Sequence, residues 1–298
     1  MKNFFDIYYK EHKKLFLIPF ILLIFNISVL IYSYATTGNF VEMDSTLKGG
    51  VTLTFHYDLS INIEGLKEHL INGAETDDID ISIIRNMLSN EMIGYEVVTE
   101  QGIVKELLVE LIEEYINDEL FEDDISFGSQ SSVIGQNFAK EAGWLFFIGA
   151  LLMLGVSYAY FRDIIPALSI VVSTLADVIG VLAVFNLFSI KISVITIGAL
   201  LMIMGYSTDS DILLSTNILK KKDGTLKDRM IGAFKTELTM NATALITFII
   251  MLLLSSVEAI KQISMVLIVG MFFDLLNTWL MNASIQRTYL EYKESRKK

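Results

Sequence analysis

The sequence predicts an integral membrane protein, with an all-α bundle of six transmembrane helices and one acidic α+β domain outside the membrane. Hydrophobic residues make up 53% of the 298 residues and the mean hydropathy is +0.52, more than a water-soluble domain normally carries. The net charge of -12 fits this class because acidic and basic residues occupy different segments. The chain has no cysteine and only three, widely separated, histidines, so we expect no metal site and no cofactor.

Six apolar segments are long enough to cross a hydrocarbon core of about 30 Å, which takes roughly 20 helical residues. The predicted spans are 15–34, 144–161, 164–188, 190–214, 237–256 and 262–283. The first span is longer than the apolar part of a signal peptide, which usually has about 7 to 15 residues. We therefore expect an uncleaved anchor there.

Lysine and arginine residues predict the orientation. They gather in the N-terminal segment 1–14, the loop 215–236 and the tail 284–298. Six spans place these three segments on the same side of the membrane, and the positive-inside rule makes that side cytoplasmic. We expect a multi-pass protein of the cell (cytoplasmic) membrane, surrounded by the lipid bilayer, with both termini cytoplasmic and residues 35–143 extracytoplasmic.

Most of the acidic residues lie in the segment 35–143. Its apolar residues alternate where a strand is expected and recur at helical spacing where a helix is expected. In order, the predicted elements are a strand at 51–57, a helix at 63–70, strands at 81–87 and 95–99, a helix at 104–116 and a strand near 125–127. This β-α-β-β-α-β order predicts a ferredoxin-like domain. No catalytic constellation is present, so we expect no enzyme, and a solvated surface explains the acidity better than a cation site.

Four aspartates lie within the predicted spans, where an ionisable side chain is costly and indicates a function. Asp177 lies midway along the third span, Asp274 midway along the sixth, and Asp209 and Asp211 in the fourth, toward its cytoplasmic end. Because no lysine or arginine lies deep in a span, neutralisation requires protonation, a bound cation, internal water or a partner subunit. We therefore select all four as candidates for ion or proton coupling.

Helical spacing separates the two acids of the fourth span. Gly198, Met202, Gly205 and Asp209 share one face, on which the two glycines allow close approach of another helix. Asp209 is therefore expected to face a packed seam. Asp211 lies roughly 200° further around the helix, so the two acids do not form a dyad.

Polar residues recur on the neighbouring spans. Gly270, Asp274 and Asn277 share a face of the sixth span, where Gly270 is a further candidate for helix packing. The fifth span places Asn241 at a depth close to that of Asp209. We expect a polar centre among spans three to six and include Asn241 among the coupling candidates. The alternative for such amide side chains is polar contact between packed helices.

The fourth span also carries a recognisable motif. The sequence IMGYSTDSDILL at 203–214, with Gly205, Tyr206 and Ser207, resembles the fourth-helix signature of the SecF family of protein-export membrane proteins, which belongs to the resistance-nodulation-division superfamily. Gly49 and Gly50 at the first strand are similar to the family's Gly-Gly motif. That family also has the same layout, with one helix first, then an outer domain, then five further helices. The resemblance covers nearly the whole chain and is strongest to the archaeal type.

The resemblance implies a function. It implies a subunit that assists Sec-dependent protein translocation beside the Sec translocation channel, with SecD as partner, preproteins as substrates, no nucleic acid and coupling to an ion (proton) gradient. It also implies that the six helices form half of a twelve-helix pseudo-symmetric unit. Bacterial members carry their acid one position after the place of Asp209, where this chain has Ser210. Two alternatives remain open: half of a small-molecule or lipid exporter of the same superfamily, and a channel scaffold without coupling.

Overall fold

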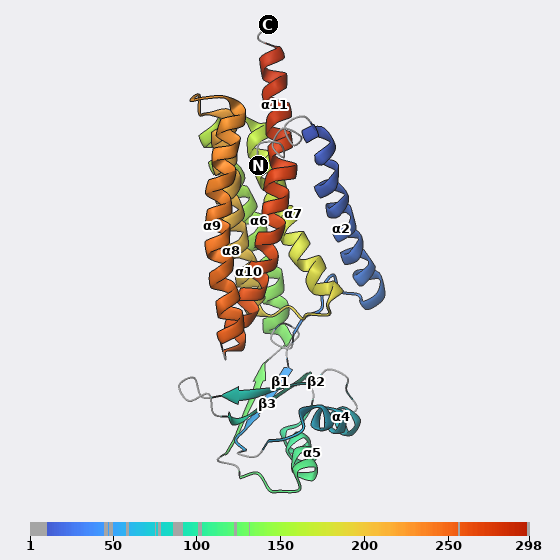
Figure 1. Cartoon of the computed structure of the whole chain (residues 1–298). Helices are drawn as coiled ribbons and strands as arrows, with labels where there is room; N and C mark the ends of the chain where they lie inside the picture. The colour runs from blue at the N-terminus through green and yellow to red at the C-terminus, as the bar shows by residue number, and fades with distance from the viewer. Residues whose placement is uncertain are drawn as a thin grey trace. The chain divides into compact units, whose positions relative to one another are not determined.

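Figure 1 shows the computed structural model of the chain. The structure describes residues 11–44, 47, 50–57, 60–74, 76, 79–85, 92–100, 103–121, 124–130, 132–255 and 257–296. The chain divides into two compact units. The helical unit consists of Met1–Glu42 and Gly143–Lys298, and the α+β unit is Met43–Ala142.

Six helices among the described residues are long and apolar enough to cross a membrane, which confirms the predicted number of apolar helices. They are α2 (Leu17–Thr37), α6 (Ser132–Phe161), α7 (Ile164–Leu187), α8 (Val194–Leu219), α9 (Leu226–Leu254), and a long final helix. The final helix runs from α10 (Glu258–Leu276) through the π-helical segment η2 (Asn277–Asn282) into α11 (Ala283–Ser295).

Several helices extend beyond the predicted limits of their spans. The helix α6 begins at Ser132, inside the predicted outer segment 35–143, and α8 continues to Leu219, inside the predicted loop 215–236. The helix α9 begins at Leu226, inside the predicted loop 215–236, because Thr225 and Asp228 form a capping box in which each side chain accepts a hydrogen bond from the other residue's backbone N–H. The helix α11 continues to Ser295 through most of the predicted tail 284–298. Hydropathy marks where a segment stops being apolar, and a helix need not end there.

The helices α7, α8 and α10 form the centre of the helical unit. The helix α2 packs on α7, and α9 packs on α8 and α10 (Figure 1). The apolar window of α7 is 67% buried, whereas that of α6 is 6% buried. Two glycines allow close approach of the central helices, because a Cβ atom at Gly270 would collide with Ile203 of α8 and one at Gly180 with Phe273 of α10.

The α+β unit contains one four-stranded antiparallel sheet in the order β2-β3-β1-β4. Its elements are β1 (Gly50–Phe55), α4 (Ile63–Ala74), β2 (Ile79–Arg85), β3 (Met92–Glu100), α5 (Lys105–Ile116) and β4 (Ile125–Gln130). They follow one another in the order β-α-β-β-α-β. The first strand ends at Phe55, two residues before the predicted end at 57.

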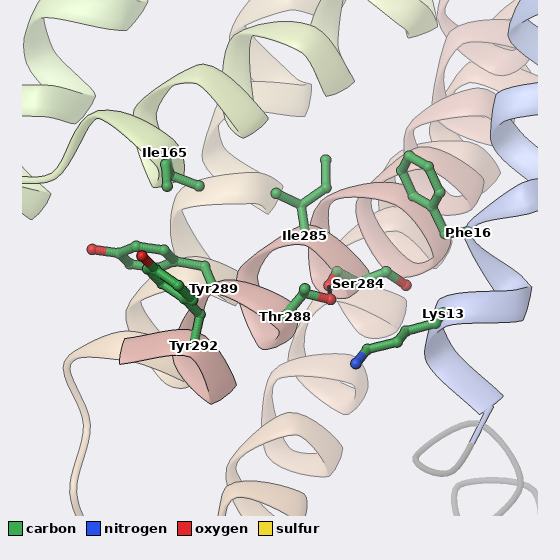
Figure 2. A pocket seen from close by; sticks show the side chains of 8 residues that line it. All are labelled: Lys13, Phe16, Ile165, Ser284, Ile285, Thr288, Tyr289 and Tyr292. Carbon is green, nitrogen blue, oxygen red and sulfur yellow. Dashed lines mark hydrogen bonds between the residues drawn. The ribbon is translucent and has the colours of Figure 1, made fainter. Parts of the chain in front are cut away.

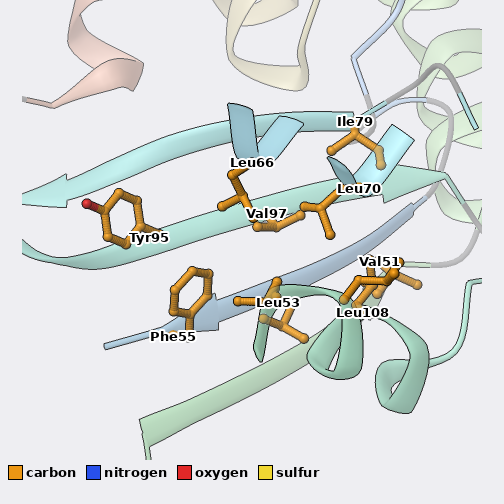
Figure 3. Close-up of a cluster of buried hydrophobic side chains, with 11 residues drawn as sticks. Val51, Leu53, Phe55, Leu66, Leu70, Ile79, Tyr95, Val97 and Leu108 are labelled. Carbon is orange, nitrogen blue, oxygen red and sulfur yellow. The ribbon is translucent and has the colours of Figure 1, made fainter. Parts of the chain in front are cut away.

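The core of the α+β unit lies between the sheet and its two helices (Figure 3). Alternate residues of β1 point to the same face, as the two-residue period of a strand requires. Phe55 of β1 stacks on Tyr95 of β3, with ring centroids 5.5 Å apart. The other fully or nearly fully buried side chains of this core are Val51, Leu53, Leu66, Leu70, Ile79, Val97, Leu108, Leu111 and Ile112.

An ion pair ties α11 to the turn between α6 and α7. Lys293 Nζ lies 2.7 Å from Asp163 Oδ2, and both side chains are partly exposed. The hydrogen bond from Lys293 lowers the pKa of Asp163 below its ordinary value, and this effect exceeds the opposing effect of burial.

We expect Asp163→Asn to lower the free energy of unfolding by less than about 1 kcal/mol at pH 7, since exposed ion pairs contribute little. A lowered pKa in the folded state means that this stabilisation is present above the unfolded pKa of about 4 and is lost as the pH falls through the folded value. Thermal unfolding of both proteins at pH 7 and pH 3 measures the difference. A difference that persists undiminished at pH 3 would contradict the ion pair as its source.

Candidate functional site

Three of the four predicted aspartates lie together in the interior of the helical unit. Asp177 of α7 and Asp211 of α8 are 0% exposed, and Asp274 of α10 is 2% exposed. No lysine or arginine forms an ion pair with them in the described part of the chain. We call these three residues the carboxyl cluster. Hydroxyl and amide groups from neighbouring helices provide its hydrogen bonds.

Asp177 joins three helices. The Ser207 hydroxyl of α8 lies 2.5 Å from Asp177 Oδ2 and 3.1 Å from Thr174 Oγ1. Asn277 Nδ2 of η2 donates to Asp177 Oδ1 over 2.6 Å. Both carboxylate oxygens therefore accept a hydrogen bond, as a buried polar group requires.

Thr278 bridges the other two acids. Its hydroxyl oxygen lies 2.9 Å from Asp211 Oδ1 and 3.2 Å from Asp274 Oδ1. A hydroxyl carries one hydrogen and can donate to only one of two carboxylates at a time. The second contact is a hydrogen bond only if one of the two carboxyl groups is protonated and donates to the Thr278 oxygen. The geometry is therefore suited to holding one proton between Asp211 and Asp274.

The remaining contacts of the two acids differ. Asp274 Oδ2 accepts hydrogen bonds from Ser210 at 3.1 Å and from Asn241 at 3.4 Å. Asp211 Oδ1 accepts one from Asn282 Nδ2 at 2.7 Å, while no donor lies within 3.5 Å of Asp211 Oδ2 among the described residues. The buried Ser173 hydroxyl of α7 faces this carboxyl group at a longer distance.

A chain of buried polar groups leads from the cluster toward the ends of α7 and α8 that border the basic segments. Asn282 Oδ1 accepts hydrogen bonds from Ser169 Oγ at 2.8 Å and from Gln286 Nε2 at 3.2 Å. Gln286 Nε2 also lies 3.0 Å from Ser215 Oγ. All four residues, Ser169, Ser215, Asn282 and Gln286, are buried. The cluster is therefore connected through side-chain hydrogen bonds to the end of the helical unit that borders the basic segments.

The π-helical segment η2 supplies three of the donors, Asn277, Thr278 and Asn282. The π-helix is rare and occurs mostly as single turns, frequently at functional sites. Helical spacing predicted the shared face of Asp274 and Asn277, but it gave no indication of the wider turn that follows.

Asp209 lies apart from the cluster on an exposed face of α8. It lines a groove of about 440 Å³ together with residues of α9, including Thr239, Asn241 and Thr243. Gly198 and Gly205 lie on the same face, and a Cβ atom added at either glycine would meet no atom of another described element within 4 Å. The seam that the spacing predicts around Asp209 is therefore not filled by the described part of this chain.

Two other motif residues lie near this face or the cluster. Tyr206 is partly exposed and makes an edge contact with Phe248 of α9, with ring centroids 6.4 Å apart, whereas Ser207 faces inward to Asp177. Gly50 opens β1. Gly49 lies outside the described residues.

Glu237 is a buried acid that the sequence patterns did not single out. This residue is 0% exposed on the buried face of α9, which also carries Met230, Ala233 and Asn241. Among the described residues no donor lies within 3.5 Å of either carboxylate oxygen, and the polar side chain that faces this carboxyl group is that of Trp279. Hydropathy placed Glu237 at the first residue of a span, where an acid is unremarkable. Its spacing of four from Asn241 was the signal that could have identified it.

We expect Glu237→Met to raise the free energy of unfolding by about 1–3 kcal/mol, because a buried polar group without a close hydrogen bond costs about that much. Methionine has a similar length and no group that needs a hydrogen bond. Thermal unfolding of the purified chain in detergent measures the change. Glu237→Gln is the matched control, since it keeps polar atoms at the site and should gain less. A destabilised Met variant would show that the acid contributes favourably to the fold.

Among the described residues, no group of three or more His, Cys, Asp and Glu side chains is arranged to hold a metal ion. The cluster is a set of carboxyl groups that share hydroxyl and amide donors from α7, α8, α10 and η2. Such a set can bind and release protons.

The fold and the cluster define a multi-span membrane protein with an acidic centre among its helices. The family model described as "Protein export membrane protein SecD/SecF, C-terminal" matches residues 115–292. The chain is 30% identical over 290 residues to the protein-export membrane protein SecF of Pyrococcus furiosus, covering 96% of this chain and 94% of that protein. It is 31% identical over 296 residues to SecF of Methanocaldococcus jannaschii, covering 95% and 98%. The chain belongs to the SecF family of protein-export membrane proteins.

The fold is also similar to a solved structure. The crystal structure of SecDF, a translocon-associated membrane protein from Thermus thermophilus, matches with a TM-score of 0.72 and 16% sequence identity. The match covers 95% of this chain and 38% of that chain. The chain therefore spans well under half the length of SecDF, and the likeness concerns the fold of that part.

Proposed function

We propose that this chain is the SecF subunit of a SecD–SecF complex that assists Sec-dependent protein translocation across the cytoplasmic membrane, with coupling to a proton gradient. The relatives that match over nearly their whole length support the role in export. The observation that carries the coupling is the carboxyl cluster of Asp177, Asp211 and Asp274, which is buried without a lysine or arginine partner among the described residues. Buried carboxyl groups of this kind in membrane helices mark proton relays.

In the proposed orientation the basic segments lie in the cytoplasm and the α+β unit lies outside, where it meets the preprotein. The distribution of lysine and arginine supports this orientation. The α+β unit is proposed to be a ferredoxin-like domain, supported by its β-α-β-β-α-β order and by the sheet order β2-β3-β1-β4.

The proposed coupling uses Asp211 and Asp274 as the proton-binding pair and Thr278 as the group that joins them. Loading a proton on either acid satisfies both contacts of the Thr278 hydroxyl, and releasing it leaves one contact without a hydrogen. Asp177, held by Ser207 and Asn277, would transmit this change to α7. The protonation state of the pair would thereby alter how α7, α8 and η2 are held together.

The proposed partner surface is the exposed face of α8 with Gly198, Met202, Gly205 and Asp209. Two glycines without described neighbours leave room for a closely packed helix, which supports a second six-helix subunit at this face. SecD would complete the twelve-helix unit there. Asp209 would then lie at the interface between the two subunits and not in the carboxyl cluster.

Site-directed cross-linking tests this proposal, and the absence of cysteine from the natural chain allows single-cysteine variants. We expect a benzophenone probe at Met202→Cys to capture a second six-helix subunit in native membranes. The same probe at Leu152→Cys on α6, where the side chain is 64% exposed, is the control for random lipid-facing contact. Equal capture from both positions, or recovery of this chain alone in gently solubilised complexes, would contradict the proposed partner surface.

A further inference from the structure

A second cavity lies in the helical unit at the end where α2 and α7 begin, next to α11 (Figure 2). Its volume is about 500 Å³. Phe16, Ile165 and Ile285 line it with aliphatic and aromatic carbon, and the rings of Tyr289 and Tyr292 lie together on another side. We call this cavity the basic-end groove, because the helices that form it adjoin the two lysine- and arginine-rich terminal segments.

The hydroxyl groups of Ser284 and Thr288, which line the basic-end groove, already have partners in the chain. Ser284 Oγ donates to the backbone oxygen of His12 over 2.9 Å. Thr288 Oγ1 donates to the backbone oxygen of Ser284 over 2.8 Å. An occupant therefore finds apolar contacts and no unsatisfied hydrogen-bonding group among these described interior residues, which favours a hydrocarbon chain over a polar solute.

Positive charge lies at the edge of the groove. Lys13 is 65% exposed, and its ammonium group lies 3.2 Å from Glu291 Oε2. An ammonium group has three donors, so this pair leaves donors for a further anion. The flanking segments strengthen the effect, with four Lys and Arg against two Asp and Glu in residues 1–14 and five against two in residues 284–298.

The position of the groove matches the level of lipid headgroups. The basic segments that flank apolar spans lie at the membrane surface, and tyrosine rings are enriched at that level because they have an apolar body and a polar tip. Basic pockets between transmembrane helices at this surface bind acidic lipid headgroups. The occupant that fits both the apolar interior and the cationic edge is a lipid.

We propose that the basic-end groove binds one anionic phospholipid of the adjoining leaflet, with an acyl chain against Phe16, Ile165 and Ile285 and its phosphate at Lys13. The lipid would join α2 to α7 and α11 on the side of the bundle that carries Phe16 and Ile285. This site is separate from the carboxyl cluster and does not depend on the proposed coupling.

Native mass spectrometry of the purified full-length chain tests the site with two probes, phosphatidylglycerol and phosphatidylcholine. We expect one phosphatidylglycerol to be retained in preference to phosphatidylcholine. Lys13→Gln should weaken phosphatidylglycerol retention about fivefold, which corresponds to about 1 kcal/mol for one cation at the lipid surface. Ile285→Trp should fill the groove and remove retention of the lipid. Leu152→Trp, on the exposed surface of α6, is the control and should retain it.

Two results would overturn the proposal. One is equal retention of both lipids that neither Lys13→Gln nor Ile285→Trp changes. The other is a full-length chain that retains no lipid but gains retention when residues 2–9 are deleted, because the N-terminal segment would then occupy the groove. Lys13→Gln alters an exposed side chain only, so it remains informative if Ile285→Trp fails to fold.

Discussion

Asp274→Asn is expected to abolish the gradient-dependent part of protein export while leaving the chain folded and assembled with its partner. Asparagine has nearly the same shape as aspartate and can keep contacts with Ser210 and Thr278. It cannot bind and release a proton, so the pair that Thr278 joins loses its function. Translocation into membrane vesicles, measured with the proton gradient present and after it is collapsed, shows whether the two rates have become equal.

Asp209→Asn is the matched control for this experiment. It is the same chemical change in the same helix bundle, but at an exposed position outside the carboxyl cluster. We expect gradient dependence to survive, with any loss appearing in recovery of the partner subunit. Full gradient dependence in the Asp274→Asn complex would favour a channel scaffold without coupling. Loss of gradient dependence in Asp209→Asn alone, with normal assembly, would move the coupling site to the exposed face of α8.

The largest expected effect on stability is that of Phe55→Ala in the α+β unit. Phe55 is the last residue of β1. Its side chain is fully buried between the sheet and the two helices, and it stacks on Tyr95. Removal of a buried phenylalanine ring typically costs about 3–5 kcal/mol, because apolar contact is lost and a cavity remains. Hydrogen exchange of the full-length protein should therefore show faster exchange in β1, β3 and α4, with α7 as an internal reference.

Phe127→Ala is the control, because it removes the same kind of ring from the neighbouring strand β4. Its side chain is 37% exposed, so we expect a loss of no more than about 1 kcal/mol. Phe127 lies opposite Leu53 and so on the same face of the sheet, but on the edge strand β4, where more of its side chain is exposed. Equal exchange rates in the two variants would contradict a central place for Phe55 in this core.

The sequence predicted the number of apolar helices because lipid imposes one simple requirement, a run of about 20 apolar residues. It identified Asp177, Asp211 and Asp274 because an acid in such a run is rare. It could not bring these three together, since helical spacing relates residues on one helix and says nothing about which faces of different helices meet. The helices that carry the cluster approach closely at Gly270, which was a predicted packing position, and at Gly180, which the sequence patterns did not indicate.

Asp209 and Glu237 show where prediction from one sequence reaches its limit. Asp209 shares a face with two glycines, a pattern that predicts helix packing, but the surface lies open within the described part of this chain. A sequence pattern of this kind is the same whether the partner helix belongs to the same chain or to another. Glu237 was overlooked for a different reason, because hydropathy treats an acid at the edge of an apolar run as a boundary even when tertiary packing buries it completely.

The π-helical turn from Asn277 to Asn282 also has a consequence for comparing relatives of this chain. A π-turn accommodates one more residue than an α-turn of the same height, so a relative that lacks this turn would be one residue shorter here. Aligned without a gap, the side chains beyond the turn would be displaced by about 100° around the helix axis, which is the rotation of one α-helical residue. A one-residue gap within this turn restores the register, so that the positions of Asn282 and Gln286 are compared with their true counterparts.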